Sequence, residues 1–140
     1  MICMPGRVFL DSNILVYAQD GSAAGKQRTC REVVAALAES GDGVISTQVL
    51  QEFFVAVTRK LGVSPLAAKG VMKTFDVFEI VQVSPALIQE AVDCSVLNRL
   101  SFWDSLILAA ASSAGCAMVY SEDLGAGQQV LGVKIQNPLA

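Results

Sequence analysis

The sequence predicts an α/β fold in which a small parallel β-sheet of four to five strands is flanked by helices. Short apolar runs alternate with longer segments of helical periodicity, and this alternation is typical of a parallel sheet covered by helices. A chain of 140 residues that is 53% apolar and 16% charged is long enough to fill one hydrophobic core. We therefore expect residues 1–140 to form a single domain that needs no disulfide or structural metal to fold.

The first part of the chain is expected to form one strand and two helices. The apolar run at residues 7–11 predicts a strand, and residues 12–18 predict a short helix that ends before the turn-forming residues 20–22. A long helix is expected over residues 23–40 because its apolar residues recur at helical spacing. These apolar residues are Val33, Val34, Leu37 and Ala38.

The middle of the chain repeats the pattern with clear stop and start signals. A short strand at residues 44–46 leads into a strongly amphipathic helix over residues 47–61, which Gly62 ends. Ser64 and Pro65 are a favourable N-cap and first helical residue, so the next helix should begin there and run to about residue 75.

The last part combines two helices with the remaining strands. A strand is expected at residues 79–83, followed by a helix that starts at Ser84 and Pro85 and reaches about residue 100. Another helix should run from Ser101 to residue 114. Residues 117–121 and 133–136 then complete the sheet, with a glycine-rich connection between them.

The chain contains no histidine, and its 10 basic and 13 acidic residues give a net charge of −3. The missing imidazole excludes Ser-His-Asp triads, histidine acid–base catalysis and histidine-containing zinc sites. Any hydrolytic chemistry must therefore use carboxylates, hydroxyls, thiols, amines, or a metal that is held by oxygen ligands.

The four cysteines are too widely spaced for a zinc ribbon or a thioredoxin-type site. Each lies in or beside an apolar stretch, which favours buried thiols in a reducing compartment. They are Cys3, Cys30, Cys94 and Cys116. The first nine residues lack the apolar run of a signal peptide, and the nearly uncharged stretch 105–121 falls short of the roughly 18 to 20 apolar residues that a bilayer requires. We therefore expect a cytoplasmic protein with no membrane partner.

Four acidic residues stand in apolar surroundings rather than on polar helix faces. Asp11 ends an apolar strand, Glu52 lies inside an apolar helical run, Asp104 follows Phe102 and Trp103, and Asp123 follows an apolar strand closely. A charge at such a position must be neutralised, paired or bound to a metal, because removing a lone carboxylate from water costs several kcal/mol.

The expected positions of these four acids converge. Asp11 and Asp123 fall at the carboxyl ends of two strands, Asp104 lies in the first turn of a helix, and Glu52 lies about one turn into the helix after the second strand. The crevice at the carboxyl ends of parallel strands is where such sheets bind ligands. Clustered carboxylates repel unless a cation lies among them, and an all-oxygen site selects Mg²⁺ or Mn²⁺. Such a site suits metal-assisted attack of water on a phosphodiester.

Each of the four positions also has an ordinary structural interpretation. Asp11 can cap the helix that follows it, and Asp104 can complete a capping box with Ser101. Glu52 can form a surface pair along its helix, and Asp123 can be a polar turn residue. Only their joint placement at one rim indicates a site.

Four segments around these acids resemble the four acidic motifs of the PIN domain in order and spacing. They are FLDSNILVYA at 9–18, STQVLQEF at 46–53, LSFWDSLI at 100–107 and YSEDL at 120–124. The resemblance covers nearly the whole chain and is closest to the stand-alone bacterial form, the VapC-like toxins of toxin–antitoxin pairs. It implies a Rossmann-like three-layer fold and a Mg²⁺- or Mn²⁺-dependent ribonuclease.

The resemblance also implies roles for individual residues. The acids that would bind the metal and carry catalysis are Asp11, Glu52, Asp104 and Asp123. Ser12, Asn13 and Ser121 match the positions whose hydroxyl or amide groups would orient carboxylates or water around the metal. Glu122, beside the last of these acids, is acidic as well.

RNA binding has to be reconciled with the negative net charge. Residues 1–75 hold 8 basic and 6 acidic residues, whereas residues 76–140 hold 2 basic and 7 acidic residues. The candidates for phosphate contacts, for which a solvated helix face is the alternative, are Lys26, Arg28, Arg31, Arg59 and Lys60. Trp103 could stack on a base, although a single aromatic residue before a helix belongs more often to the core.

The resemblance to toxins implies two protein partners as well as an RNA substrate. An antitoxin protein would cover the acidic crevice, and two copies of the chain would form a homodimer. The mean hydropathy of +0.51 is consistent with a buried apolar interface.

Two other functions remain open at this point. A catalytically silent PIN fold would serve as an RNA- or protein-binding module. A phosphatase of the haloacid dehalogenase type would use Asp11 as its nucleophile, but it requires a second Asp at the position that Asn13 occupies here.

Overall fold

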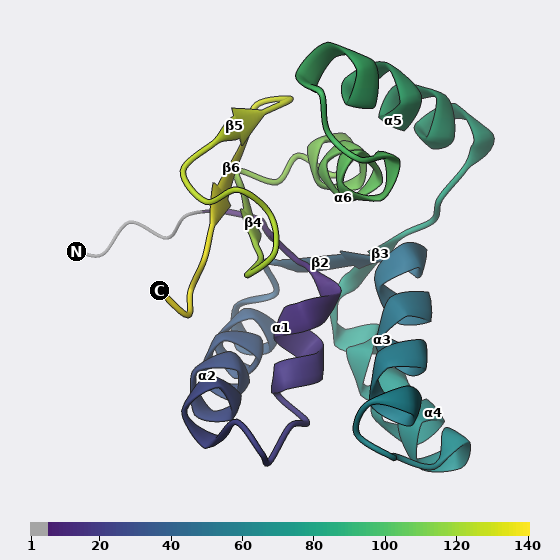
Figure 1. Cartoon of the computed structure of the whole chain (residues 1–140). Coiled ribbons are helices and arrows are strands. Elements are labelled where there is room, and N and C mark those ends of the chain that lie inside the picture. The colour runs from purple at the N-terminus through teal and green to yellow at the C-terminus, as the bar shows by residue number, and fades with distance from the viewer. Residues whose placement is uncertain (1–5) are drawn as a thin grey trace.

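The computed structural model describes residues 6–140, which form a three-layer α/β fold around one sheet (Figure 1). The strands are β1 (Val8–Leu10), β2 (Gly43–Ser46), β3 (Glu79–Val81), β4 (Met118–Tyr120), β5 (Gln129–Val130) and β6 (Val133–Gln136). The helices are α1 (Ser12–Tyr17), α2 (Ala24–Ser40), α3 (Thr47–Arg59), α4 (Pro65–Thr74), α5 (Pro85–Asn98) and α6 (Phe102–Ser113), and a short 3-10 helix, η1 (Phe75–Val77), follows α4. The α/β class expected from the sequence is therefore confirmed.

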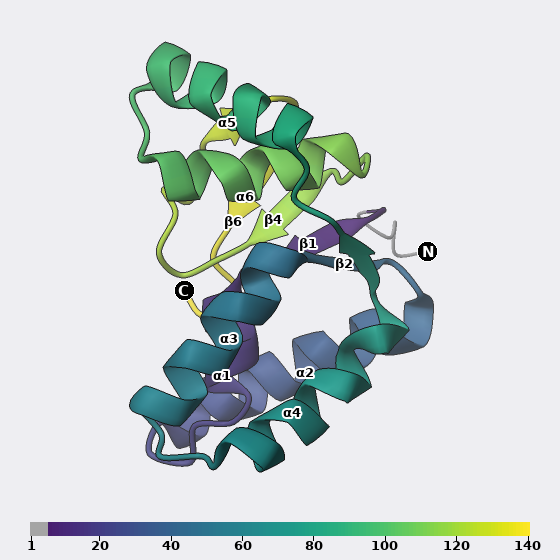
Figure 2. The same ribbon diagram turned by 90° about the vertical axis from the view of Figure 1, so that its right-hand side faces the viewer.

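The sheet has the strand order β3-β2-β1-β4-β6-β5. All neighbouring strands are parallel except β5, which runs antiparallel to β6. Figure 2 shows α5 and α6 on one face of the sheet and α1 to α4 on the other. The chain leaves β1 toward β2 on one side and later returns to form β4 on the other. The carboxyl ends of β1 and β4 thus flank a switch point, where open α/β sheets bind their ligands.

The sheet has six strands, whereas four to five were expected. The additional strand is β5, which lies in the segment expected to be a glycine-rich connection. It forms a hairpin with β6 through Leu131 and Gly132, whose φ angles are 53° and 77°. Two positive φ angles suit a tight hairpin turn, but asparagine or glycine usually occupies the position held here by Leu131. The short length of β5 and this unusual turn residue explain why the local pattern did not reveal the strand.

The central strands are buried on both faces. Val8, Phe9 and Leu10 are each 0% exposed, so β1 reads as a continuous apolar run rather than as an alternating one. On one face, α6 contributes the buried small residues 109–111. On the other, Phe53 of α3 packs edge-on against Phe75 with ring centroids 5.0 Å apart. This packing holds in place the carboxyl ends of β1 and β4, which Asp11 and Asp123 follow.

Three cysteines of the described chain, Cys30, Cys94 and Cys116, are buried and unpaired, as expected for structural thiols. Cys3 lies outside the described residues. So do five of the first nine residues, in which the sequence predicts no signal peptide. Within residues 6–140, no helix has the length and apolar character needed to cross a membrane.

Candidate active site

The four acidic residues come from four different segments. Asp11 follows β1 directly and caps α1, Glu52 lies in α3, Asp104 lies in the first turn of α6, and Asp123 lies in the loop after β4. Leu10 of β1 is paired with Tyr120 of β4, so the residues that follow these two strands are neighbours. The parallel pairing therefore brings together the first and the last acidic motif.

Asp11 is the most buried of these acids, with 7% of its surface exposed. The Ser12 backbone N–H donates to its Oδ1 at 2.7 Å, and the Ser121 hydroxyl donates to its Oδ2 at 2.7 Å. Burial raises the pKa of the Asp11 carboxyl to about 6; these two hydrogen bonds oppose the rise, and the charges of Glu52 and Asp123 add to it. Asp11 therefore caps α1, and its own carboxylate is poorly solvated when it is charged.

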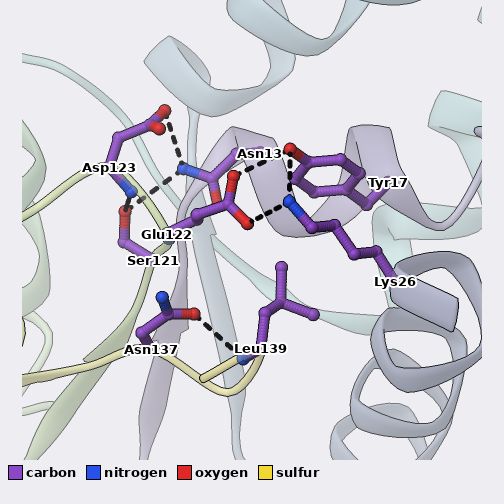
Figure 3. A network of polar contacts seen from close by, with 8 residues as sticks. All are labelled: Asn13, Tyr17, Lys26, Ser121, Glu122, Asp123, Asn137 and Leu139. Carbon is purple, nitrogen blue, oxygen red and sulfur yellow. Dashed lines mark hydrogen bonds and ion pairs between the residues drawn. The ribbon is translucent and has the colours of Figure 1, made fainter. Parts of the chain in front are cut away.

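Asn13 connects the first acid to the last one. Its amide nitrogen donates to Asp11 Oδ2 at 3.3 Å, to Ser121 Oγ at 3.2 Å and to Asp123 Oδ2 at 3.2 Å. Its amide oxygen accepts the backbone N–H of Glu122 at 3.1 Å. Figure 3 shows the Asn13 amide joined to Asp123 and to Ser121. The side-chain amide at position 13 thus orients both the Asp123 carboxylate and the loop that carries it.

Glu52 is tied to the site by neighbouring side chains. The Ser12 hydroxyl donates to Glu52 Oε1 at 3.1 Å, and the Gln48 amide donates to Oε2 at 3.4 Å. The Gln48 amide also donates to the Trp103 carbonyl at 3.2 Å, which joins α3 to the first turn of α6. Glu52 forms no ion pair with any described residue, but its hydrogen bond with Gln48 is a pair along α3, so the surface-pair alternative is realised in part.

Asp104 shows half of the capping box considered from the sequence. Its backbone N–H donates to the Ser101 hydroxyl at 3.1 Å, which confirms Ser101 as the N-cap of α6. Its carboxylate accepts no hydrogen bond from any residue between 6 and 140 and therefore makes no return bond to Ser101. Hydrogen bonds thus join Asp11, Asn13 and Asp123, whereas Asp104 remains apart from that network.

A cleft of about 630 Å³ opens beside Glu52. It is lined by Ser12, Gln48, Gln51, Glu52, Val55, Ala56, Arg59, Lys60 and Trp103. Trp103 is 62% exposed, so the interpretation that favoured a core position for it is wrong. Adjacent residues of a helix point in different directions, and here Phe102 is half-buried while the Trp103 ring lies edge-on to it at 5.1 Å and borders the cleft.

The structure separates the five basic candidates into three places. Arg59 and Lys60 line the cleft beside Glu52. Arg28 and Arg31 line another hollow along α2, where the Arg31 Nε also donates to the Ala18 carbonyl at 2.7 Å. Lys26 forms an ion pair with Glu122, with Nζ and Oε2 2.9 Å apart.

Sequence reasoning gave neither Gln48 nor Tyr17 a role in the site, although both contact acidic side chains of this region. Gln48 stands four residues before Glu52, and Tyr17 four residues after Asn13. Helical spacing could therefore have placed each beside a predicted site residue.

The oxygen-bearing side chains of the candidate site are of the chemical type that binds a hard divalent cation. Carboxylate, hydroxyl and amide oxygens are the ligands that Mg²⁺ prefers, and Mg²⁺ commonly keeps several waters while binding only one or two protein carboxylates. Within residues 6–140, no three acidic or cysteine side chains already lie together as a metal-binding group. A cation beside Asp11 would nevertheless relieve the cost of its buried charge, with Asp123 or Glu52 as a second carboxylate.

Comparisons with known proteins agree with this architecture. The family model of the PIN domain matches residues 8–127. VapC20 of Mycobacterium tuberculosis, a toxin that cleaves the sarcin–ricin loop, is similar with a TM-score of 0.67 and 20% identity, over 83% of this chain and 89% of that chain. A toxin–antitoxin complex from Klebsiella pneumoniae gives a TM-score of 0.69 and 18% identity, over 90% and 94%.

A third solved structure, DNA-bound VapBC from Salmonella typhimurium, gives a TM-score of 0.67 and 19% identity, over 95% of this chain and 98% of that chain. At these identities the likeness shows a shared fold. No curated protein matches the chain in sequence.

Proposed function

Because the chain belongs to the PIN domain family, we propose that it is a metal-dependent endoribonuclease that cleaves single-stranded or loop RNA. We further propose that it is the toxin of a toxin–antitoxin pair. One observation carries the first proposal. The buried Asp11 is linked through Asn13 to Asp123 at the switch point of a parallel sheet, and through Ser12 to Glu52 at the mouth of a cleft.

The roles proposed for these residues follow from their contacts. Asp11 and Asp123, together with Glu52 and Asp104 from the neighbouring helices, would hold Mg²⁺ or Mn²⁺. A bound cation of this kind supplies an activated water and neutralises charge on a phosphodiester. The chain's own contribution is to orient the carboxylates, which the hydroxyls of Ser12 and Ser121 and the amide of Asn13 do through hydrogen bonds.

The cleft suits a nucleic-acid strand. Arg59 and Lys60 offer positive charge for phosphates, and the exposed Trp103 offers a face on which an unpaired base can stack. These groups flank Glu52, so a strand bound along the cleft would bring a phosphate to the acidic rim. We propose the second basic group, Arg28 and Arg31 on α2, as a more distant RNA contact.

The toxin role is supported by the solved relatives, two of which are toxin–antitoxin complexes. We propose that an antitoxin protein covers the acidic crevice and that the chain acts in the cytoplasm. We also propose a homodimer, for which α5 offers exposed apolar side chains. These are Ile88, Val92, Val96 and Leu97.

Cleavage of a single-stranded RNA by the purified protein in Mn²⁺ or Mg²⁺ tests the enzymatic proposal. EDTA, Asp11→Asn and Asp104→Asn should each abolish cleavage, whereas Asp93→Asn should leave it unchanged because Asp93 is exposed on α5. Cleavage that survives Asp11→Asn or Asp104→Asn would identify a contaminating nuclease and refute the assignment.

The alternative of a catalytically silent binding module is favoured by one observation, the lack of a ready-made three-acid group in residues 6–140. Calorimetry separates the two functions. RNA binding without any heat of Mn²⁺ binding would support the silent module, and Mn²⁺ binding that Asp11→Asn removes would support the nuclease.

A further inference from the structure

The loop that carries Asp123 is held by side chains rather than by the sheet. The Ser121 N–H donates to the Gln136 carbonyl at 3.0 Å, and the next backbone bond to the sheet is from the Gly127 N–H to the Ile135 carbonyl at 2.9 Å. Between these points, the Glu122 N–H donates to Asn13, and the N–H groups of residues 123 and 124 donate to the Ser121 hydroxyl at 3.1 and 3.2 Å. The position of this loop therefore depends on the side chains that hold it.

The two residues beside Asp123 are anchored in different places. Leu124 is only 5% exposed and belongs to the hydrophobic core. Glu122 reaches toward α1 and α2, as Figure 3 shows. The Tyr17 hydroxyl donates to Glu122 Oε1 at 2.7 Å, and Lys26 Nζ donates to Oε2 at 2.9 Å. Both carboxylate oxygens of Glu122 are thus occupied, and Asp123 lies between two attached neighbours.

Tyr17 and Lys26 also contact each other. Lys26 Nζ lies 3.4 Å from the Tyr17 hydroxyl and 4.8 Å from the centroid of its ring. The hydrogen bond from Lys26, and after it the one from Tyr17, lowers the pKa of the Glu122 carboxyl and so favours its charged form. The Lys26 side chain is 46% exposed, and a pair at this exposure adds little to global stability. Its effect is therefore local, on the loop to which Glu122 belongs.

We propose that Tyr17, Lys26 and Glu122 form a clasp that positions Asp123 at the acidic rim. Lys26 is then a positioning residue and not a phosphate contact. The metal part of this inference rests on the proposed function, in which Asp123 helps to hold the cation. The clasp joins the start of α2 to a loop 96 residues further along the chain. Among the described residues, the Asn13 amide is the side chain that donates to the Asp123 carboxylate, so the clasp acts on Asp123 through the loop backbone beside Glu122.

Hydrogen exchange in EDTA tests the clasp without any reference to activity. In Lys26→Met, the amides of residues 122–124 should exchange about two- to fivefold faster, the factor expected from losing one exposed or partly buried ion pair. Tyr17→Phe should shift the same amides in the same direction, and Lys26→Arg should restore protection. Lys69→Met is the matched control, because Lys69 is exposed on α4 and pairs with no acidic residue in the described part of the chain. Unchanged exchange in Lys26→Met would overturn the proposal.

Binding measurements separate positioning from phosphate contact. A clasp predicts that Lys26→Met and Tyr17→Phe each raise the Kd for Mn²⁺ by about two- to fivefold and leave the RNA affinity in EDTA unchanged. If Lys26→Met weakens RNA binding while Tyr17→Phe does not, and exchange in the loop is unchanged, Lys26 is a phosphate contact and the proposal is wrong. Faster loop exchange in a protein that neither binds Mn²⁺ nor cleaves RNA would support the clasp and refute the proposed function.

Discussion

Replacing Asp11 with asparagine should stabilise the metal-free protein at neutral pH while abolishing the proposed RNA cleavage. Asp11 is 7% exposed, and its burial is the main cause of a pKa of about 6 in place of 3.8. About two pKa units, at 1.36 kcal/mol each, correspond to roughly 3 kcal/mol of unfavourable free energy. An amide nitrogen in place of Asp11 Oδ2 cannot accept the hydrogen bonds that Ser121 and Asn13 donate there, which costs about 1–2 kcal/mol. We therefore expect Asp11→Asn to raise the free energy of unfolding by about 1–2 kcal/mol.

The pH dependence of this effect has a definite sign. The folded-state pKa of Asp11 lies above the unfolded-state value, so between about pH 4 and pH 6 the native protein binds more protons at this site than the unfolded chain. The stability that wild type derives from a protonated Asp11 is present below pH 3.8. It is lost as the pH rises through about 6.

Urea unfolding in EDTA at several pH values between 4 and 8 measures the effect. The stability advantage of Asp11→Asn should be small at pH 4 and should reach its full value by pH 7. If the proposed metal site exists, addition of Mg²⁺ should then stabilise wild type but not the variant, because a ligand that binds only the native state stabilises it. If the variant is less stable than wild type at pH 7.5 in EDTA, or if their difference does not change with pH, the reasoning is wrong.

Three further outcomes test the packing, the helix cap and the thiols. A Cβ on Gly43 would lie 2.5 Å from Phe78 Cδ1, so Gly43→Ala should lower the free energy of unfolding by about 1–3 kcal/mol in a urea titration; an unchanged midpoint would contradict the packing. Ser101→Ala removes the cap of α6 and should cost about 1 kcal/mol in the same assay, and wild-type stability would show that the cap contributes nothing. Burial raises the pKa of the Cys30 and Cys116 thiols to about 11. Iodoacetamide at pH 8 should therefore modify them only after unfolding, and mass spectrometry would reveal any labelling of the native protein.

The order of elements was predictable because the signals that define it are local. Ser64 and Ser84, each followed by proline, were expected to start helices, and their hydroxyls accept the N–H groups of Ala67 and Leu87 at 3.3 and 3.1 Å. These caps need only three neighbouring residues. In contrast, β5 depends on pairing with β6, and Leu131 in its turn carries no local signal for a positive φ.

The sequence offered residues for the candidate site, but it did not indicate their contacts. Acidic residues in apolar surroundings identified Asp11, which is 7% exposed, because the cost of desolvating a charge can be read from the neighbouring residues. Asp123 is exposed in the fold, so the apolar strand before it indicated its place after β4 and not a buried charge. The exposure of Trp103 was not predictable, since two adjacent aromatic residues gave no indication of which one faces the core. Lys26 looked like any other surface lysine until the fold placed Glu122 beside it.

By itself, the sequence determined the fold class and the succession of strands and helices apart from β5, and it indicated the acidic candidates, because each of these depends on composition or on spacings of a few residues. Only the tertiary structure decided which side chains meet. Asn13 and Asp123 are 110 residues apart, and Lys26 and Glu122 are 96 apart. They meet because β1 and β4 are neighbours in the sheet, and long-range strand order is a property of the whole packed core.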